Sequence, residues 1–209
     1  MTFAIGHFAL GYLFGKGSSS LLKVEVNMPL LLLVSILPDI DLALGFITHR
    51  GPSHSLIVIT LLSLPFFAVY KKQMVPYYLA LLSHVLIGDL ITGGSQMFWP
   101  LTEKSYGVLY FKVTSPMDAP IELILIIVAL SFMVKLKDLE PFLLPGIFNL
   151  TLVIPFGATL GPLLQTARAI SLGFDYDLPL LLVVPSLFFV VLFAIAIIVE
   201  LRILLRSGK

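Results

Sequence analysis

The amino-acid sequence predicts an all-α protein, a polytopic membrane bundle of about six to seven transmembrane or half-membrane helices. Hydrophobic residues make up 58% of the 209 residues and charged residues only 12%, whereas a soluble domain carries about 25%. The mean hydropathy is +1.05. Several stretches approach the ~20 apolar residues that a spanning helix needs. This composition excludes a disordered chain and an ordinary soluble enzyme, and the net charge of +1 argues against a nucleic-acid partner.

The predicted helices correspond to successive apolar segments. The first, Phe3–Gly15, is short and lacks the basic start and cleavage site of a signal peptide, so we expect a retained helix that spans or half-spans the membrane. The later segments are Met28–Ile47, Ser55–Tyr70, Pro76–Thr92, Ala119–Val134, Pro141–Ala167, which prolines interrupt, and Leu178–Val199, which has no charge. We expect one membrane-embedded domain over residues 1–209, with the polar motifs in 1–100 and additional transmembrane helices in 117–209.

The basic residues predict the orientation of the chain. With seven spans, nine of the thirteen Lys and Arg residues fall on one face and four on the other. Cytoplasmic loops carry the excess of Lys and Arg, so we expect an integral protein of the inner (cytoplasmic) membrane with a cytoplasmic C-terminus. The four residues on the opposite face are Arg50, Lys104, Lys112 and Arg168.

Ionisable residues gather at that opposite face. All four histidines lie in the first 84 residues, and three aspartates lie among or beside them. The predicted topology brings them to one level from four helices or helix ends. Ionisable groups at membrane depth are costly and mark functional sites. The residues are His7, Asp39, Asp41, His49, His54, His84 and Asp89.

Imidazole and carboxylate groups at one depth predict a site for a divalent cation. We expect Zn²⁺ first, with Mn²⁺ or Fe²⁺ as alternatives, and one or two ions per chain. Such ions clamp the oxygens of a phosphoryl displacement and lower the pKa of bound water to about 7. The chain has no cysteine, so this chemistry uses no thiolate. The predicted metal ligands are His7, Asp39, Asp41, His54, His84 and Asp89.

Three residues are predicted to act on the substrate. Asp39 or His49 is positioned to serve as general base, with Asp41 as a further candidate. Arg50 has the planar guanidinium that suits phosphate oxygens. The loop Gly93–Pro116, with Trp99, Lys104, Tyr106 and Tyr110, either covers a substrate head group or forms an interfacial aromatic belt.

Each residue also has a structural interpretation. Asp39 and Asp41 could cap a helix, and His84 could hydrogen-bond across helices. Asp118 and Glu122, four residues apart, are interpreted first as carboxylates at the positive end of a helix dipole. These interpretations do not explain why four histidines and three aspartates share one level.

Five ordered motifs in residues 1–100 support a family resemblance. They are His7 with Gly11, Pro38-Asp39-Ile40-Asp41, His49-Arg50-Gly51-Pro52-Ser53-His54-Ser55, His84 with Asp89, and Thr92-Gly93-Gly94 followed by Trp99-Pro100. Together they resemble the YdjM-like family of inner-membrane metal-dependent hydrolases. The resemblance implies a multi-pass membrane protein with a His/Asp metal centre, and it carries over to His7, Asp39, Asp41, His49, His54, His84 and Asp89.

One motif departs from the expected spacing. The resemblance implies His-x-x-x-Asp in the segment Pro76–Thr92, but Asp89 is five residues after His84. On an ideal α-helix Asp89 is therefore rotated about 140° from His84. Either Gly88 marks a bulge that restores convergence, or one of the two residues is not a ligand.

The sequence thus predicts a membrane-bound metal-dependent hydrolase that acts on a phosphoester or related bond of a lipid or amphiphilic substrate. Membrane lipids are the expected surroundings, and a phosphorylated lipid-like molecule is the expected partner. Two alternatives stay open. A divalent-metal or proton transporter would need a polar file across the bilayer, and a non-enzymatic protein with a structural metal would show closed coordination.

Overall fold

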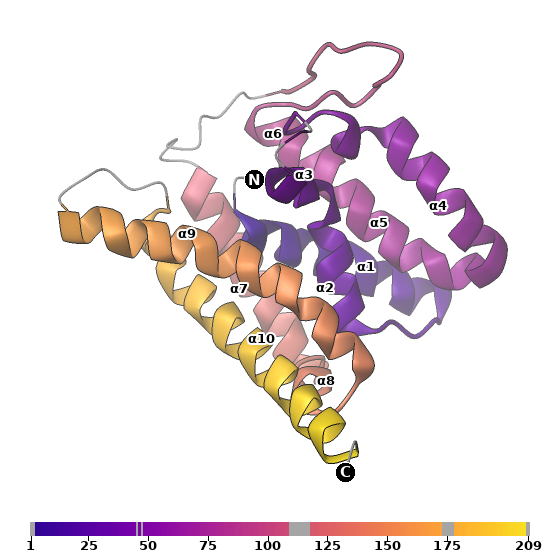
Figure 1. The fold of residues 1–209 in the computed structure, drawn as a ribbon. Helices are drawn as coiled ribbons and strands as arrows, with labels where there is room; N and C mark the ends of the chain where they lie inside the picture. The colour runs from indigo at the N-terminus through magenta and orange to yellow at the C-terminus, as the bar shows by residue number, and fades with distance from the viewer. Residues whose placement is uncertain (1–2, 45, 47, 109–117, 173–177, 208–209) are drawn as a thin grey trace.

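The computed structural model describes residues 3–44, 46, 48–108, 118–172 and 178–207, and these are built from helices (Figure 1). Among these residues, extended segments pair only at an isolated bridge between Ser95 and Tyr106. The predicted all-α membrane bundle is confirmed. The α-helices are α1 (Ala4–Leu22), α2 (Met28–Ser35), α3 (Asp41–Leu44), α4 (Leu56–Tyr70), α5 (Val75–Ser83), α6 (Leu90–Thr92), α7 (Asp118–Lys135), α8 (Glu140–Leu143), α9 (Val153–Leu172) and α10 (Leu180–Ser207).

Three helical stretches of the described chain are long and apolar enough to cross a membrane. They are Leu56–Asp89, Ile147–Ser171 and Leu180–Arg206. The first folds back at a 3₁₀ turn, Lys71–Met74, so that α4 and α5 lie side by side (Figure 1). Large apolar side chains stay exposed on these helices, as Leu62 on α4 and Val184 on α10 do, which fits contact with lipid.

Helix α1 occupies the centre of the bundle, with the α4–α5 hairpin on one side and α7, α9 and α10 on the other (Figure 1). Its glycines permit close packing. A Cβ at Gly11 would collide with the side chain of Ser35, and one at Gly15 would lie 2.5 Å from Leu31. In the structure the first apolar segment forms a 19-residue helix, which is longer than the predicted Phe3–Gly15.

The second predicted helix, Met28–Ile47, is broken in the structure. Helix α2 ends at Ser35, a 3₁₀ turn covers Leu37–Ile40, and α3 follows. Pro38 explains the break, because its ring disfavours α conformation in the preceding residue and removes one N–H donor. As a result, Asp39 and Asp41 lie where the helix has ended.

The loop after α6 begins with a tight turn. Gly93 and Gly94 have φ of 149° and 80°, which favour glycine. A Cβ at Gly94 would lie 2.5 Å from the carbonyl oxygen of Tyr106, so the two arms of the loop can approach only because that position lacks a side chain. Tyr110, part of the predicted loop, lies outside the described residues.

Candidate metal centre

The predicted site residues converge at the end of the bundle that contains α3 and α6. His7 comes from α1, Asp39 from the 3₁₀ turn after α2, and His54 from the 3₁₀ turn before α4. His84 and Asp89 come from the π-helical turn that follows α5. His7, His54, His84 and Asp89 are each at most 3% exposed. Burial of so many ionisable groups is costly unless they bind one another or a cation.

Four atoms form a compact set: Nε2 of His54 and His84, Oδ1 of Asp39 and Oδ2 of Asp89. The nitrogen–oxygen distances are 3.3 Å (His54–Asp39), 3.4 Å (His84–Asp39), 3.5 Å (His54–Asp89) and 3.9 Å (His84–Asp89). Ligand atoms of a tetrahedral Zn²⁺, at bond lengths near 2.0–2.1 Å, lie about 3.3 Å apart. Three of the four nitrogen–oxygen distances are therefore close to the ligand separations of a tetrahedral metal site, and the fourth, between His84 and Asp89, is longer.

The hydrogen bonds of the two buried histidines leave their Nε2 atoms directed at this set. Nδ1 of His84 donates to the backbone carbonyl of Ser35 at 2.8 Å. Nδ1 of His54 lies 2.9 Å from the hydroxyl oxygen of Ser53 and 3.2 Å from Oδ2 of Asp41. When the other ring nitrogen donates in this way, the neutral imidazole presents its lone pair at Nε2, as metal-bound histidines do.

Two buried atoms of the set also lack a hydrogen-bond partner in the described part of the chain. They are Nε2 of His84 and Oδ2 of Asp89. Buried polar atoms without partners are rare in folded proteins and require an explanation. A cation held between them supplies one, so the residues present fit the predicted metal.

Asp41 lies behind His54, away from the four-atom set. Its Oδ1 is 3.0 Å from Nδ1 of His49, and its Oδ2 accepts from the backbone N–H of Arg50 at 3.1 Å and from the hydroxyl of Ser53 at 2.7 Å. Both carboxylate oxygens are thus engaged by the His49–His54 turn. Asp41 belongs to none of the groups of described residues whose ligand atoms lie within 4.8 Å of one another.

A π-helical turn resolves the irregular spacing of His84 and Asp89. Residues His84–Asp89 form this turn, which contains one more residue than an α turn and brings both side chains to the same site. The predicted bulge is confirmed. A Cβ at Gly88 would lie 2.5 Å from Cε1 of His7, so the bulge also makes room for that ring.

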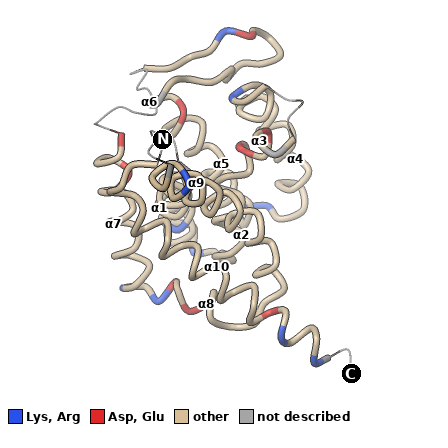
Figure 2. The backbone as a smooth tube through the Cα atoms, turned by 60° about the vertical axis from the view of Figure 1, so that its left-hand side comes forward, with Lys and Arg blue, Asp and Glu red and all other residues tan. Residues whose placement is uncertain are grey.

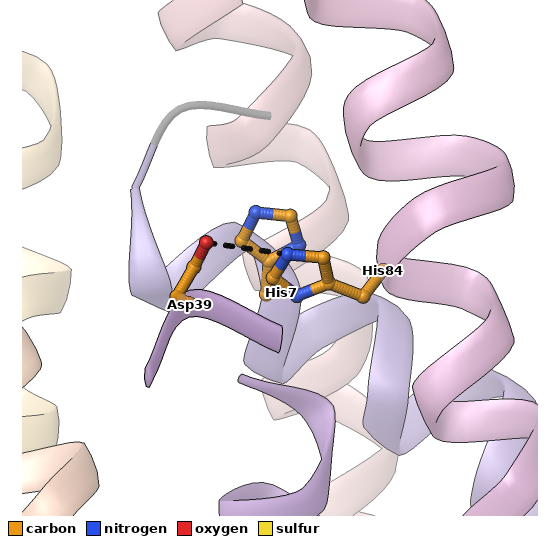
Figure 3. Close-up of side chains that lie close together, drawn as sticks. All are labelled: His7, Asp39 and His84. Atoms are coloured by element: carbon orange, nitrogen blue, oxygen red, sulfur yellow. Dashed lines mark ion pairs between the residues drawn. The ribbon is translucent and has the colours of Figure 1, made fainter. Parts of the chain in front are cut away.

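His7 stacks on His84, with ring centroids 3.6 Å apart and planes at 12°. Figure 3 shows the two rings beside Asp39, with the ion pair between Asp39 and His84 dashed. These three residues form a group able to hold a metal ion; the two other such groups are Asp39, His49 and His54, and His54, His84 and Asp89. Asp39, His54 and His84 each belong to two of the three groups. A lone pair that binds an ion in one group is therefore not available to another group.

Arg50 lies at the solvent-exposed side of the site. Its Nε lies 3.6 Å from Oδ1 of Asp89, and its backbone adopts a left-handed φ of 61°. A Cβ at Gly93 would lie 2.6 Å from its guanidinium, so the glycine turn gives this side chain its space. The side chains of Arg50, Asp39 and His49 are 22%, 21% and 42% exposed, which opens the site to solvent on this side.

The charges of the site favour a cation. Burial lowers the pKa of His54, but its hydrogen bonds to Asp39 and Asp41 and the charge of Asp89 outweigh burial and raise the pKa to about 9. The carboxylates therefore hold a proton on this imidazole at neutral pH. A metal ion bound at Nε2 would take the place of that proton.

Asp118 and Glu122 are both buried at the start of α7, where Oε1 of Glu122 accepts a hydrogen bond from the backbone N–H of Phe3 at 3.4 Å.

The sequence analysis missed two groups that support the site, the backbone carbonyl of Ser35 and the hydroxyl of Ser53. The carbonyl of Ser35 carries no signal in its side chain, whereas Ser53 lies within the His-Arg-Gly-Pro-Ser-His motif.

The fold and site define an all-helical membrane protein with a buried His/Asp cluster able to hold a metal ion. The chain belongs to the family of YdjM inner membrane proteins, which matches residues 1–161. The predicted resemblance is confirmed, and it extends beyond residues 1–100 into α9. No curated protein and no solved structure matches the chain.

Proposed function

We propose that this protein is a membrane-bound metal-dependent hydrolase that cleaves a phosphoester or related bond of a lipid-like substrate. The observation that carries the proposal is the four-atom set of His54, His84, Asp39 and Asp89, two of whose atoms are buried without hydrogen-bond partners. Two nitrogens and two carboxylate oxygens favour Zn²⁺, with Mn²⁺ or Fe²⁺ as alternatives.

The position of the ligands supports catalysis over a purely structural metal. His54, His84 and Asp89 are buried and would hold the ion from the protein side, while Asp39 reaches it from the side open to solvent. Catalytic zinc sites admit a water or substrate oxygen beside their protein ligands and can expand to five-coordinate, and the partly exposed side at Asp39 is where such an oxygen would enter. When bound, the ion supplies Lewis-acid polarisation of the phosphoryl oxygens and acidifies a coordinated water.

The chain's own residues supply binding and proton transfer. Arg50 would hold the anionic phosphoryl group through its guanidinium. A water oxygen would bond to phosphorus as the bond from phosphorus to the leaving oxygen breaks. His49, whose Nδ1 contacts Asp41, would accept the proton of the water and return it to the leaving oxygen. Asp41 would orient His49 and His54 and act as a positioning residue.

The location of the site supports a lipid-like substrate. The cluster lies at one end of the helices, beside the apolar surface of the α4–α5 hairpin. At such a depth a phosphorylated head group meets the polar site while the acyl or prenyl chain stays in the bilayer. Membrane lipids would therefore surround the protein and also supply its substrate.

The test is metal analysis and hydrolysis on protein purified in a maltoside detergent. We expect about one divalent ion per chain and release of a water-soluble product from phosphatidic acid, phosphatidylglycerol, phosphatidylcholine or polyprenyl phosphate. His84→Ala and Asp89→Asn should each lower metal affinity and turnover by more than about a hundredfold. The control is Asp138→Asn, because that carboxylate pairs with Lys16 outside the cluster.

Two outcomes would overturn the proposal. A bound ion without turnover on any of these substrates, whose removal by chelator lowers the melting temperature, would identify a structural metal. Flux of Zn²⁺ or protons into liposomes without turnover would identify a transporter.

A further inference from the structure

A pocket of about 310 Å³ lies in the loops beside the metal centre. It is lined by Phe46, Thr48, Pro52, Gln96, Trp99 and Glu103. Its volume is at the lower end of the range for small-molecule sites. None of its lining residues belongs to the four-atom set.

The pocket shares a wall with the site. Thr48 and Pro52 bracket the turn that carries His49 and Arg50. The backbone N–H of Gln96 donates to the carbonyl of Arg50 at 2.9 Å, which ties the two loops together. A molecule whose phosphate is held by Arg50 would therefore extend its next group toward this pocket.

The lining favours a positively charged group. Trp99 is the aromatic residue that binds cations best, and Glu103 adds a carboxylate. Within the described chain Glu103 makes no ion pair. The neighbouring cation, Lys104, lies instead over the ring of Tyr106, with Nζ 5.6 Å from its centroid. The pocket thus presents an aromatic residue and a carboxylate that no cation of the described residues pairs with.

We propose that this pocket binds the ammonium group of a zwitterionic phospholipid head group, of the choline or ethanolamine type. The phosphate would lie at Arg50 and the ammonium group between Trp99 and Glu103. The phosphate half of this inference rests on the proposed function, whereas the ammonium half rests on the pocket alone.

Trp99 is the only tryptophan of the chain, so its fluorescence reports on this pocket without interference. The experiment titrates the Asp89→Asn variant, which should not turn over, in maltoside detergent with dihexanoyl phosphatidylcholine and, separately, dihexanoyl phosphatidylglycerol. We expect a saturable fluorescence change, with the choline lipid binding at least about fivefold more tightly than the glycerol lipid, the size of a cation–aromatic contact at a solvent-exposed site.

Glu103→Gln in the same background should remove this preference, whereas Glu25→Gln, in the loop between α1 and α2, should leave it intact. Equal affinity for the two lipids, or an unchanged preference in Glu103→Gln, would overturn the inference. The readout is binding, so a choline preference without hydrolysis by the wild type would refute only the proposed hydrolase, and hydrolysis without any preference would refute only the ammonium pocket.

Discussion

At the scale of single residues, His54 and His84 differ from ordinary buried histidines in what their Nδ1 atoms contact. One is fixed by the carboxylate of Asp41 and the other by the carbonyl of Ser35, so both Nε2 atoms are directed at the same point. This arrangement sets tautomer and ring orientation before any ion binds. Preorganisation of this kind raises metal affinity, because little freedom is lost on binding.

Asp41→Asn tests this role directly. We expect metal affinity to fall by about 10–100-fold, because the amide holds His54 less firmly and does not balance its charge. Competition with a chromophoric chelator measures the affinity, and thermal unfolding checks that the variant folds. Asp138→Asn serves as control, since that buried carboxylate binds Lys16 and Tyr12 instead. Unchanged affinity in Asp41→Asn would contradict a positioning role.

Gly93→Ala tests the space that Arg50 requires. The added Cβ would collide with the guanidinium of Arg50, and a φ of 149° strains the backbone of an alanine residue. We expect bound metal to be retained and KM for a phosphorylated substrate to rise about tenfold, the size of one charge-assisted hydrogen bond. Gly146→Ala is the control, because its Cβ would meet nothing within 4 Å. A change in kcat with KM unaltered would show that Arg50 does not bind the substrate anion.

At the scale of elements, the π-helical turn decides whether the helix can contribute two ligands. Asp89 is five positions after His84, a spacing that an ideal α-helix would place on different faces. The sequence revealed this irregularity and marked Gly88 as a possible bulge, but it could not choose between a bulge and a lost ligand. The choice depends on His7, whose ring packs against Gly88 from another helix.

Gly88→Ala should therefore disturb the site although alanine is the better helix former. We expect the free energy of unfolding to fall by about 1–3 kcal/mol from the clash with His7. Gly161→Ala on α9, where a Cβ meets nothing within 4 Å, should be neutral or raise it by about 0.5–1 kcal/mol. Urea or thermal unfolding in detergent compares the two, and equal stability would show that the bulge relaxes freely.

At the scale of the whole molecule, basic residues lie at both ends, since Arg50 and Lys104 belong to the loops at the end that contains the site (Figure 2). In Figure 2, α3 and α6 are at the upper end, and α8 and the C-terminus are at the lower end. The loop between α4 and α5 carries Lys71 and Lys72, and α7 ends in Lys135. The orientation of the chain is thus a prediction from the loop charges alone.

The orientation is testable because the chain has no cysteine. A single cysteine placed by Ser105→Cys should react with a membrane-impermeant maleimide in intact cells or spheroplasts, since the loop beside the site should face away from the cytoplasm. Lys72→Cys should react only after the membrane is permeabilised. The reverse pattern would place the site on the cytoplasmic face and the C-terminus outside.

The sequence by itself determined the class of protein and identified histidines and aspartates that the fold brings close together. Composition is enough for the first, because a chain this apolar can satisfy its backbone in lipid only as helices or a closed barrel, and no segment alternates as a barrel strand would. The histidines and aspartates were identifiable because ionisable groups are rare and costly in such a chain.

Only the tertiary structure decided how those residues divide their roles. Asp39 and Asp41 are two residues apart, yet Asp39 contacts Nε2 of His54 whereas Asp41 contacts Nδ1 on the other side of the same ring. The two carboxylates diverge because Pro38 ends α2 and the chain turns between them. Ligand geometry depends on distances of a few tenths of an ångström between segments far apart in the chain, and these distances follow from packing, which no local pattern encodes.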